Sequence, residues 1–245
     1  MDINFEGKRI LVTGACQGIG RDVSIRLSQF KGTVIGLSHM QSQLETLRKE
    51  NPNIETVCVD LRNWDDTKNA VQSVLPVDLL VNSAGVIYNK PFLDATEDDF
   101  DQTFAVNVKA MMNVSQVVAK DMIKRKIFGG SIVNLSSQAS EAALKDHIVY
   151  CSSKGAVQMM TRTMALELGP HNIRVNSVNP TVVLTEMGKL AWKDPEKAKN
   201  MLNKIPLGRF AEVEDVVDSI VFLLSERSSM INGIALPVDG GFLAT

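Results

Sequence analysis

The side chains best suited to chemistry in this sequence are a tyrosine and a lysine four residues apart, Tyr150 and Lys154. On a helix, residues at this spacing lie on one face, one turn apart. The ammonium of Lys154 would then lie beside the Tyr150 phenol, where its positive charge would lower a pKa that is ordinarily about 10. A phenol whose pKa is lowered toward neutrality can act as a general acid or base.

A serine thirteen residues before the tyrosine extends this arrangement. Ser137 closes the run 132–137, whose first residues belong to a predicted buried strand. A hydroxyl at the end of that strand could hold a carbonyl oxygen beside the phenol. The three side chains together suit proton transfer to an oxygen, coupled to hydride transfer at the attached carbon. A tyrosine and lysine at this spacing also occur by chance in many helices. The rest of the chain must therefore show whether this pair is catalytic.

Short apolar runs alternate with amphipathic stretches along the whole chain. Strands that are apolar on both faces, separated by helices, are typical of a parallel sheet covered on both sides. The pattern predicts an α/β fold: a single domain over residues 1–245 with a Rossmann-type, doubly wound parallel sheet of about seven strands and helices on both faces. Predicted strands cover 9–12, 33–37, 56–59, 77–81, 131–135, 173–178 and 234–236; predicted helices end near 31 and 50 and cover about 64–74, 97–125, 148–169 and 212–224.

The segment of about 180–210 is predicted to be irregular. It contains Pro180, Pro195 and Pro206, with a run of charged residues in the middle. A long connection inside a compact fold is often a lid or a binding loop, so we interpret it as a substrate loop. The alternative is a solvated surface excursion.

The composition narrows the class of protein. A net charge of −2 gives no basic surplus for nucleic acid or an anionic membrane. The three cysteines show neither metal-ligand spacing nor a disulfide framework, so we predict no metal and a reducing compartment. No signal peptide is visible, and no run approaches the roughly 18 apolar residues of a membrane span. We therefore predict a cytoplasmic protein.

A glycine-rich turn follows the first predicted strand. Its glycines, Gly14, Gly18 and Gly20, would let the backbone approach a pyrophosphate closely, with Gln17 and Ile19 between them. The helix that follows would present free N–H groups and the positive end of its dipole to that anion. The turn predicts a bound dinucleotide.

The end of the second predicted strand bears on which dinucleotide binds. A carboxylate there would bond the ribose 2′-hydroxyl of NAD and repel a 2′-phosphate, but the residues present are Ser38 and His39. Ser38 could donate a hydrogen bond and His39 could add partial positive charge, so NADP(H) is favoured over NAD(H). Whether Arg21 or Arg62 reaches this point is open.

Five motifs, spread over the whole chain and in the order typical of the family, resemble those of the short-chain dehydrogenase/reductase family. Besides the glycine-rich turn, the resemblance implies three further groups of cofactor contacts and a set of catalytic residues. Two residues depart from the family's pattern, Ser83 in place of an asparagine and Thr181 in place of a glycine. The implied cofactor contacts are Asp60 and Leu61 at the adenine, Asn82, Ala84 and Gly85 after the fourth strand, and Pro180, Val183 and Thr185 at the nicotinamide; the catalytic residues are Asn107, Ser137, Tyr150 and Lys154.

The resemblance also implies a role for each catalytic residue. Tyr150 would protonate the carbonyl oxygen as the hydride arrives, and Ser137 would orient that carbonyl. Lys154 would lower the Tyr150 pKa and bond the nicotinamide ribose, so both would also contact cofactor. Asn107 would bond the backbone and a water that leads protons to Lys154.

Within the family the likeness is strongest to reductases that convert L-xylulose to xylitol and reduce small α-dicarbonyls with NADPH, through runs such as 179–183. Those enzymes have basic residues where this chain has Gln17 and His39, which weakens the NADP(H) inference. A 3-oxoacyl thioester reductase on the same fold is one alternative. A dinucleotide-binding sensor without turnover is another.

Further residues are candidates for a small polar substrate pocket. His147 could hydrogen-bond a sugar hydroxyl or be merely structural. Trp192 could cover a small substrate or pack against the body of the protein. The resemblance also implies a homotetramer. The full set of predicted substrate contacts is Ser137, Gln138, Leu144, His147, Tyr150 and Trp192.

Overall fold

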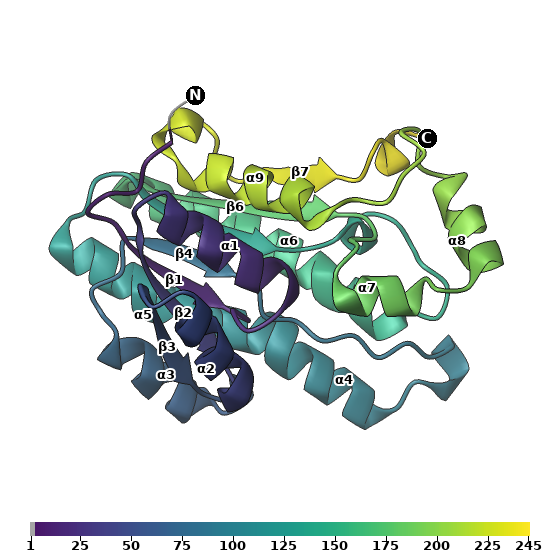
Figure 1. The fold of residues 1–245 in the computed structure, drawn as a ribbon, viewed down its shortest axis with the longest axis horizontal. Coiled ribbons are helices and arrows are strands. Elements are labelled where there is room, and N and C mark those ends of the chain that lie inside the picture. Colours follow the sequence, from purple (N-terminus) through teal and green to yellow (C-terminus); the bar gives the residue numbers. More distant parts are fainter. Residues whose placement is uncertain (1–2) are drawn as a thin grey trace.

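The computed structural model describes residues 3–245, with the side chain of Met187 excepted. Its centre is a parallel sheet with the strand order β3-β2-β1-β4-β5-β6-β7 (Figure 1). Every neighbouring pair is parallel, so all carboxyl ends meet at one edge. The strands are β1 (Arg9–Thr13), β2 (Thr33–Ser38), β3 (Ile54–Cys58), β4 (Leu79–Asn82), β5 (Gly130–Leu135), β6 (Ile173–Pro180) and β7 (Ala235–Val238).

Helices cover both faces of this sheet (Figure 1). A π-helical segment, Ala105–Ala110, joins α4 to α5, so the predicted helix of about 97–125 is one continuous helical stretch with a wider turn inside it. The α-helices are α1 (Gly18–Gln29), α2 (Gln41–Glu50), α3 (Trp64–Ser73), α4 (Glu97–Phe104), α5 (Met111–Arg125), α6 (Ile148–Leu168), α7 (Glu186–Ala191), α8 (Pro195–Leu202) and α9 (Val213–Leu224).

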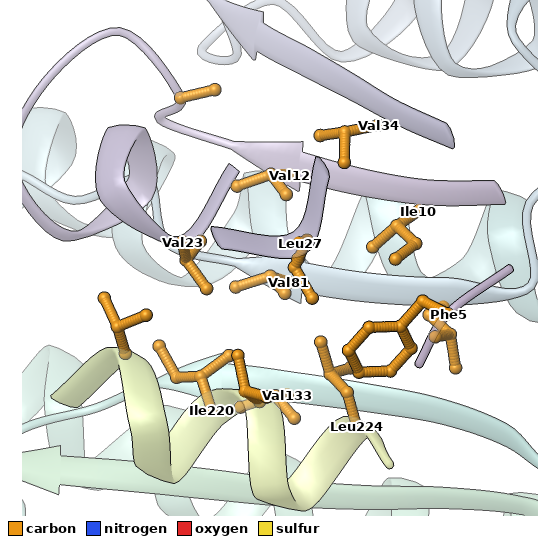
Figure 2. Close-up of a cluster of buried hydrophobic side chains, with 14 of the residues drawn as sticks. Phe5, Ile10, Val12, Val23, Leu27, Val34, Val81, Val133, Ile220 and Leu224 are labelled. Atoms are coloured by element: carbon orange, nitrogen blue, oxygen red, sulfur yellow. The ribbon is translucent and has the colours of Figure 1, made fainter. Parts of the chain in front are cut away.

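The alternation of side chains along each strand builds a separate core on each face. In β1, Ile10 and Val12 join one cluster and Leu11 joins the other, and all three are fully buried. The first cluster receives Leu27 from α1 and Ile220 from α9, two helices that pack against each other on one face of the sheet, and Figure 2 labels both side chains. The second receives side chains from α3, α5 and α6. The predicted parallel sheet with helices on both faces is confirmed.

The segment of about 180–210 is less irregular than predicted, because it contains α7 and α8. Thr185 caps α7 through a hydrogen bond from the Gly188 N–H, and Asp194 caps α8, with Pro195 at its first position. A bridge between Val183 and Ala211 closes the base of the segment. Both helices lie beyond the carboxyl ends of the strands (Figure 1), which is where a substrate loop would have to be.

Candidate active site

The predicted catalytic residues come together where β5 meets α6. Lys154 is 4% exposed, and its Nζ donates a hydrogen bond to the Leu135 carbonyl, the last of β5, at 2.8 Å. Tyr150 lies one helical turn earlier, with its ring centroid 5.5 Å from the same Nζ. The spacing of four residues thus brings ammonium and phenol onto one side of α6, as the sequence predicts.

Ser137 reaches the same point from the other element. It follows β5 and begins a short 3₁₀ turn, where its hydroxyl accepts a hydrogen bond from the Ala139 N–H at 3.1 Å. The hydroxyl also hydrogen-bonds Tyr150, which lowers the pKa of that phenol. Serine and tyrosine hydroxyls therefore converge on one place, where a carbonyl oxygen could accept from both.

The prediction that Lys154 lowers the Tyr150 pKa is wrong for this structure. Burial raises the pKa of Tyr150, and this outweighs the lowering by Ser137. No lowering by Lys154 appears in this pKa, because Lys154 loses its own proton at a lower pH than the one at which the phenol titrates. Burial also lowers the pKa of Lys154 itself, to about 8. The phenol therefore keeps its proton at neutral pH, as an acid must.

Asn107 lies in the π-helical segment and is 2% exposed. Its side chain accepts from the Val86 N–H at 2.8 Å and donates to the Val86 carbonyl at 3.0 Å and to the Ser153 hydroxyl at 3.1 Å. A Cβ on Gly85 would lie 3.4 Å from the Asn107 amide oxygen and 3.7 Å from the Lys154 Nζ. Asn107 thus ties the chain after β4 to α6, with Gly85 between Asn107 and Lys154.

The glycine-rich turn has the form of an anion cradle. Gly14 and Gly18 have φ values of +70° and +53°, and a Cβ on Gly20 would overlap the Gly14 carbonyl oxygen. The residue before α1, Gln17, makes no side-chain cap, so the first N–H groups of α1 are open to an anion. Ile19 packs into the core below. These features fit the pyrophosphate of a dinucleotide.

Two neighbouring segments complete the cradle. The Thr13 hydroxyl accepts from the N–H groups of Ser83 and Ala84 at 3.1 and 3.2 Å, which fixes the chain after β4 against the turn. A Cβ on Gly18 would lie 3.2 Å from the Thr185 methyl, so the start of α7 covers the turn. Pro180 and Val183 lead into this cover from β6.

Asn82, the last residue of β4, is hydrogen-bonded within the protein. Its amide donates to the Ser115 hydroxyl at 2.9 Å and to the Asn134 side-chain Oδ1 at 2.8 Å, and it is 5% exposed. The side chain therefore links β4 to α5 and β5, which makes it a support of this edge of the sheet.

The residues expected near the adenosine of the cofactor include charged side chains that already have partners. Ser38 is buried, and its hydroxyl donates to the Cys16 Sγ at 2.9 Å. Arg62 bonds Asp60 at 2.5 Å, and Arg21 bonds Glu50. His39 is exposed and lowers the pKa of Asp60 slightly, after the larger effect of Arg62. Both arginines are therefore paired with carboxylates, and Leu61 is buried beside Asp60.

The predicted substrate contacts divide into two groups. His147 immediately precedes α6, and its ring meets the Tyr150 ring edge-on at 6.4 Å, with Leu144 accepting its backbone N–H. Gln138 is 2% exposed, and its Oε1 has no partner within residues 3–245. Trp192 instead packs on Phe210 at 5.5 Å, in the cluster under α8. Of the two interpretations of Trp192, the structure shows the packing against the body of the protein.

Sequence reasoning missed several contacts because they join distant segments. The Leu135 carbonyl, the Ser153 hydroxyl and the pair of Lys90 with Asp99 are examples. Only Asp99 carries a local signal, since Thr96 and Asp99 have the spacing of a capping box at the start of α4.

Two further findings concern residues 3–245 as a whole. No helix in this range is both long enough and apolar enough to cross a membrane. The same residues contain no cluster of three or more His, Cys, Asp or Glu side chains placed to hold a metal ion.

Comparisons with known proteins agree with this geometry. The family model described as enoyl-(acyl carrier protein) reductase matches residues 14–243. The L-xylulose reductase of Mesocricetus auratus is 57% identical over 245 residues, covering 100% of both chains. Carbonyl reductase (NADPH) 2 of Sus scrofa is 50% identical, also covering 100% of both. A gluconate 5-dehydrogenase of Burkholderia cenocepacia, solved with NADP and tartrate, is 28% identical with a TM-score of 0.92, covering 99% of this chain and 97% of the other.

Lys154→Met tests the cost of the buried charge. Burial lowers the Lys154 pKa from 10.5 to about 8, so between these values the unfolded chain binds more protons than the folded one. The free energy of unfolding of the wild type must therefore rise with pH in this window. We expect the free energy of unfolding of Lys154→Met to exceed that of wild type at neutral pH by about 1–3 kcal/mol. The loss of the hydrogen bond to the Leu135 carbonyl reduces this gain. This gap should shrink as the pH rises above about 8.

Urea unfolding of both proteins without dinucleotide, across this pH range, gives the measurement. Lys124→Met, which removes an exposed charge on α5, is the matched control and should show no such narrowing. A gap for Lys154→Met that is constant with pH would contradict a lowered Lys154 pKa.

Proposed function

This chain belongs to the short-chain dehydrogenase/reductase family and is an oxidoreductase, and we propose that it reduces L-xylulose to xylitol, and small α-dicarbonyls, with NADPH. The observation that carries the proposal is the meeting of the Tyr150 and Ser137 hydroxyls with the buried Lys154 ammonium, at the sheet edge that also holds the glycine-rich turn. Full-length identity of 57% to an L-xylulose reductase supports this choice of substrate.

The chain's own groups account for the proton and the orientation of the substrate. The carbonyl oxygen accepts hydrogen bonds from Ser137 and Tyr150, which hold it and stabilise the charge that develops on it. The nicotinamide supplies the hydride when bound. Tyr150 gives its proton to the oxygen, and its raised pKa means that this proton is present at neutral pH before the reaction. Lys154, 5.5 Å from the ring, stabilises the phenolate that is left.

Asn107 would serve the return of the proton. It holds Val86 through both backbone groups, next to Gly85 and the Lys154 ammonium. A water bonded there would connect Lys154 to solvent. We assign Asn107 to this relay.

The cofactor contacts follow the same edge of the sheet. The pyrophosphate would lie on Gly14, Gln17, Gly18, Ile19 and Gly20, where the N–H groups of α1 are open. We assign further contacts to the adenine, ribose and nicotinamide by their position at the strand ends: Ser38, His39, Asp60, Leu61, Asn82, Ala84, Gly85, Tyr150, Lys154, Pro180, Val183 and Thr185.

We also propose a cytoplasmic location. All three cysteines, Cys16, Cys58 and Cys151, are free thiols, which suits a reducing compartment.

Tyr150→Phe should remove most of kcat, at least about tenfold, because general acid catalysis contributes about 10²–10⁴-fold. Dinucleotide binding should remain, since the glycine-rich turn is unchanged. The assay is NADPH oxidation against L-xylulose, diacetyl and an acetoacetyl thioester. Turnover of the thioester alone would favour the 3-oxoacyl reductase, and no turnover by wild type with any of the three would favour a sensor. A variant that keeps more than about a tenth of the rate would remove Tyr150 from the mechanism.

The wild type should have a lower Michaelis constant for NADPH than for NADH. His39 directly follows β2, is exposed and makes no salt bridge within residues 3–245, while Arg21 and Arg62 are held by carboxylates. His39→Arg should strengthen NADPH binding several-fold, because a guanidinium binds a phosphate through two hydrogen bonds. His171→Arg, a change of the same kind on an exposed histidine after α6, is the control. Equal constants for the two dinucleotides in wild type would reject the preference.

We propose a homotetramer that forms through the outer faces of α5 and α6. Met112 and Met159 are 38% and 58% exposed on these helices, and Leu166 is 78% exposed, whereas Met111 is in the core. Exposed apolar side chains gathered in this way mark contact surfaces. Light scattering after size exclusion should give four times the chain mass of 26.8 kDa, and Met159→Glu should lower it. A monomer would contradict the proposal.

A further inference from the structure

The loop between β4 and α4 is held at two points four residues apart. The first is Val86, whose backbone N–H and carbonyl both bond the Asn107 side chain. The second is Lys90, which forms an isolated parallel bridge with His147. The residues between these two points include Ile87 and Tyr88, which are 37% and 43% exposed, so packing alone does not fix the loop.

The Lys90 side chain fixes the second point to α4. Its Nζ lies 2.7 Å from the Asp99 Oδ2, and Asp99 is 7% exposed. The same oxygen accepts from the Thr96 N–H at 2.9 Å and from the Thr96 hydroxyl at 2.6 Å. The first of these bonds, with the Asp99 N–H donating to the Thr96 hydroxyl at 3.3 Å, forms the capping box of α4. Lys90 and Thr96 lower the pKa of Asp99 to about 2, so the carboxylate is charged wherever the enzyme works.

The Lys90 backbone fixes the same point to the segment before α6. Its N–H donates to the Asp146 carbonyl at 2.9 Å, and Lys90 and His147 form an isolated parallel bridge. Asp146 has a φ of +61°, a conformation that a non-glycine residue holds only where neighbouring contacts impose it. One residue therefore joins the start of α4 to the start of α6.

We propose that Lys90 and Asp99 are positioning residues for His147, and that they set the affinity for substrates with hydroxyl groups beside the carbonyl. The pair holds the loop, the loop pairs with 146–147, and His147 is thereby held edge-on to Tyr150. The catalytic residues are fixed independently, through Asn107 and Leu135. The inference rests on the proposed reduction of L-xylulose, in which His147 bonds a substrate hydroxyl.

Lys90→Met removes the ion pair and leaves the capping box of α4 in place. The Michaelis constant for L-xylulose should rise about three- to tenfold, the effect of losing one well-placed hydrogen bond. For diacetyl, which has no hydroxyl, both kinetic constants should stay within about twofold of wild type, since the catalytic groups do not move. Lys90→Arg keeps a cation that can reach Asp99 and should restore L-xylulose binding.

A matched variant separates positioning from stability. Arg125→Met breaks the pairs of Arg125 with Asp78 and Asp121 at the opposite edge of the sheet. It should lower the melting temperature at least as much as Lys90→Met does. It should leave both Michaelis constants unchanged. The double variant Lys90→Met, His147→Ala should be no worse for L-xylulose than His147→Ala alone, because both changes remove the same contact.

Three results would overturn the inference: additive effects in the double variant, an equal rise of both Michaelis constants, or a rise caused by Arg125→Met as well. Amide hydrogen exchange over 144–147 gives a readout that needs no substrate, and it should accelerate in Lys90→Met and not in Arg125→Met. If wild type reduces neither compound, the proposed function fails, and unchanged exchange in Lys90→Met would then show separately that the pair does not position His147.

Discussion

The burial of the Lys154 ammonium is the constraint on which the rest of this site depends. A buried charge needs a hydrogen-bond acceptor, and among residues 3–245 the Leu135 carbonyl at the end of β5 provides it. The Ser136 hydroxyl adds a second contact, donating to the Lys154 carbonyl at 3.2 Å. Because these bonds dock α6 on the end of β5, Tyr150 must lie over Ser137. The docking of α6 on β5 therefore also fixes where the reacting hydroxyls lie.

The parallel sheet brings the cofactor cradle to the same place. The order of the strands reverses between β1 and β4, and the chain leaves both strands at the carboxyl edge. The glycine-rich turn follows β1 and the segment of Ala84 and Gly85 follows β4, tied together by the Thr13 hydroxyl. Dinucleotides bind at such a reversal in open α/β sheets. Residues far apart in sequence meet because each directly follows a strand of one sheet.

Patterns within one element could be predicted from the sequence, and contacts between elements mostly could not. The face shared by Tyr150 and Lys154 follows from helix geometry, and alternating apolar runs gave the sheet. The raised Tyr150 pKa depends on desolvation by side chains from several elements, so the spacing to Lys154 pointed the wrong way. Trp192 packs on Phe210, which no local pattern links to it. The helices α7 and α8 did carry cap signals, but helices this short show little periodicity.

Burial shifts the two central pKa values in opposite directions, raising that of Tyr150 and lowering that of Lys154, since it disfavours the phenolate and the ammonium alike. Before reaction, a neutral phenol lies beside an ammonium that gains little from it. Once the phenol has given up its proton, the same ammonium lies 5.5 Å from a ring that carries negative charge. The attraction between them appears only as the proton leaves, and an interaction stronger in the transition state than in the ground state is what accelerates a reaction. The cost of burying Lys154 is therefore offset during proton transfer.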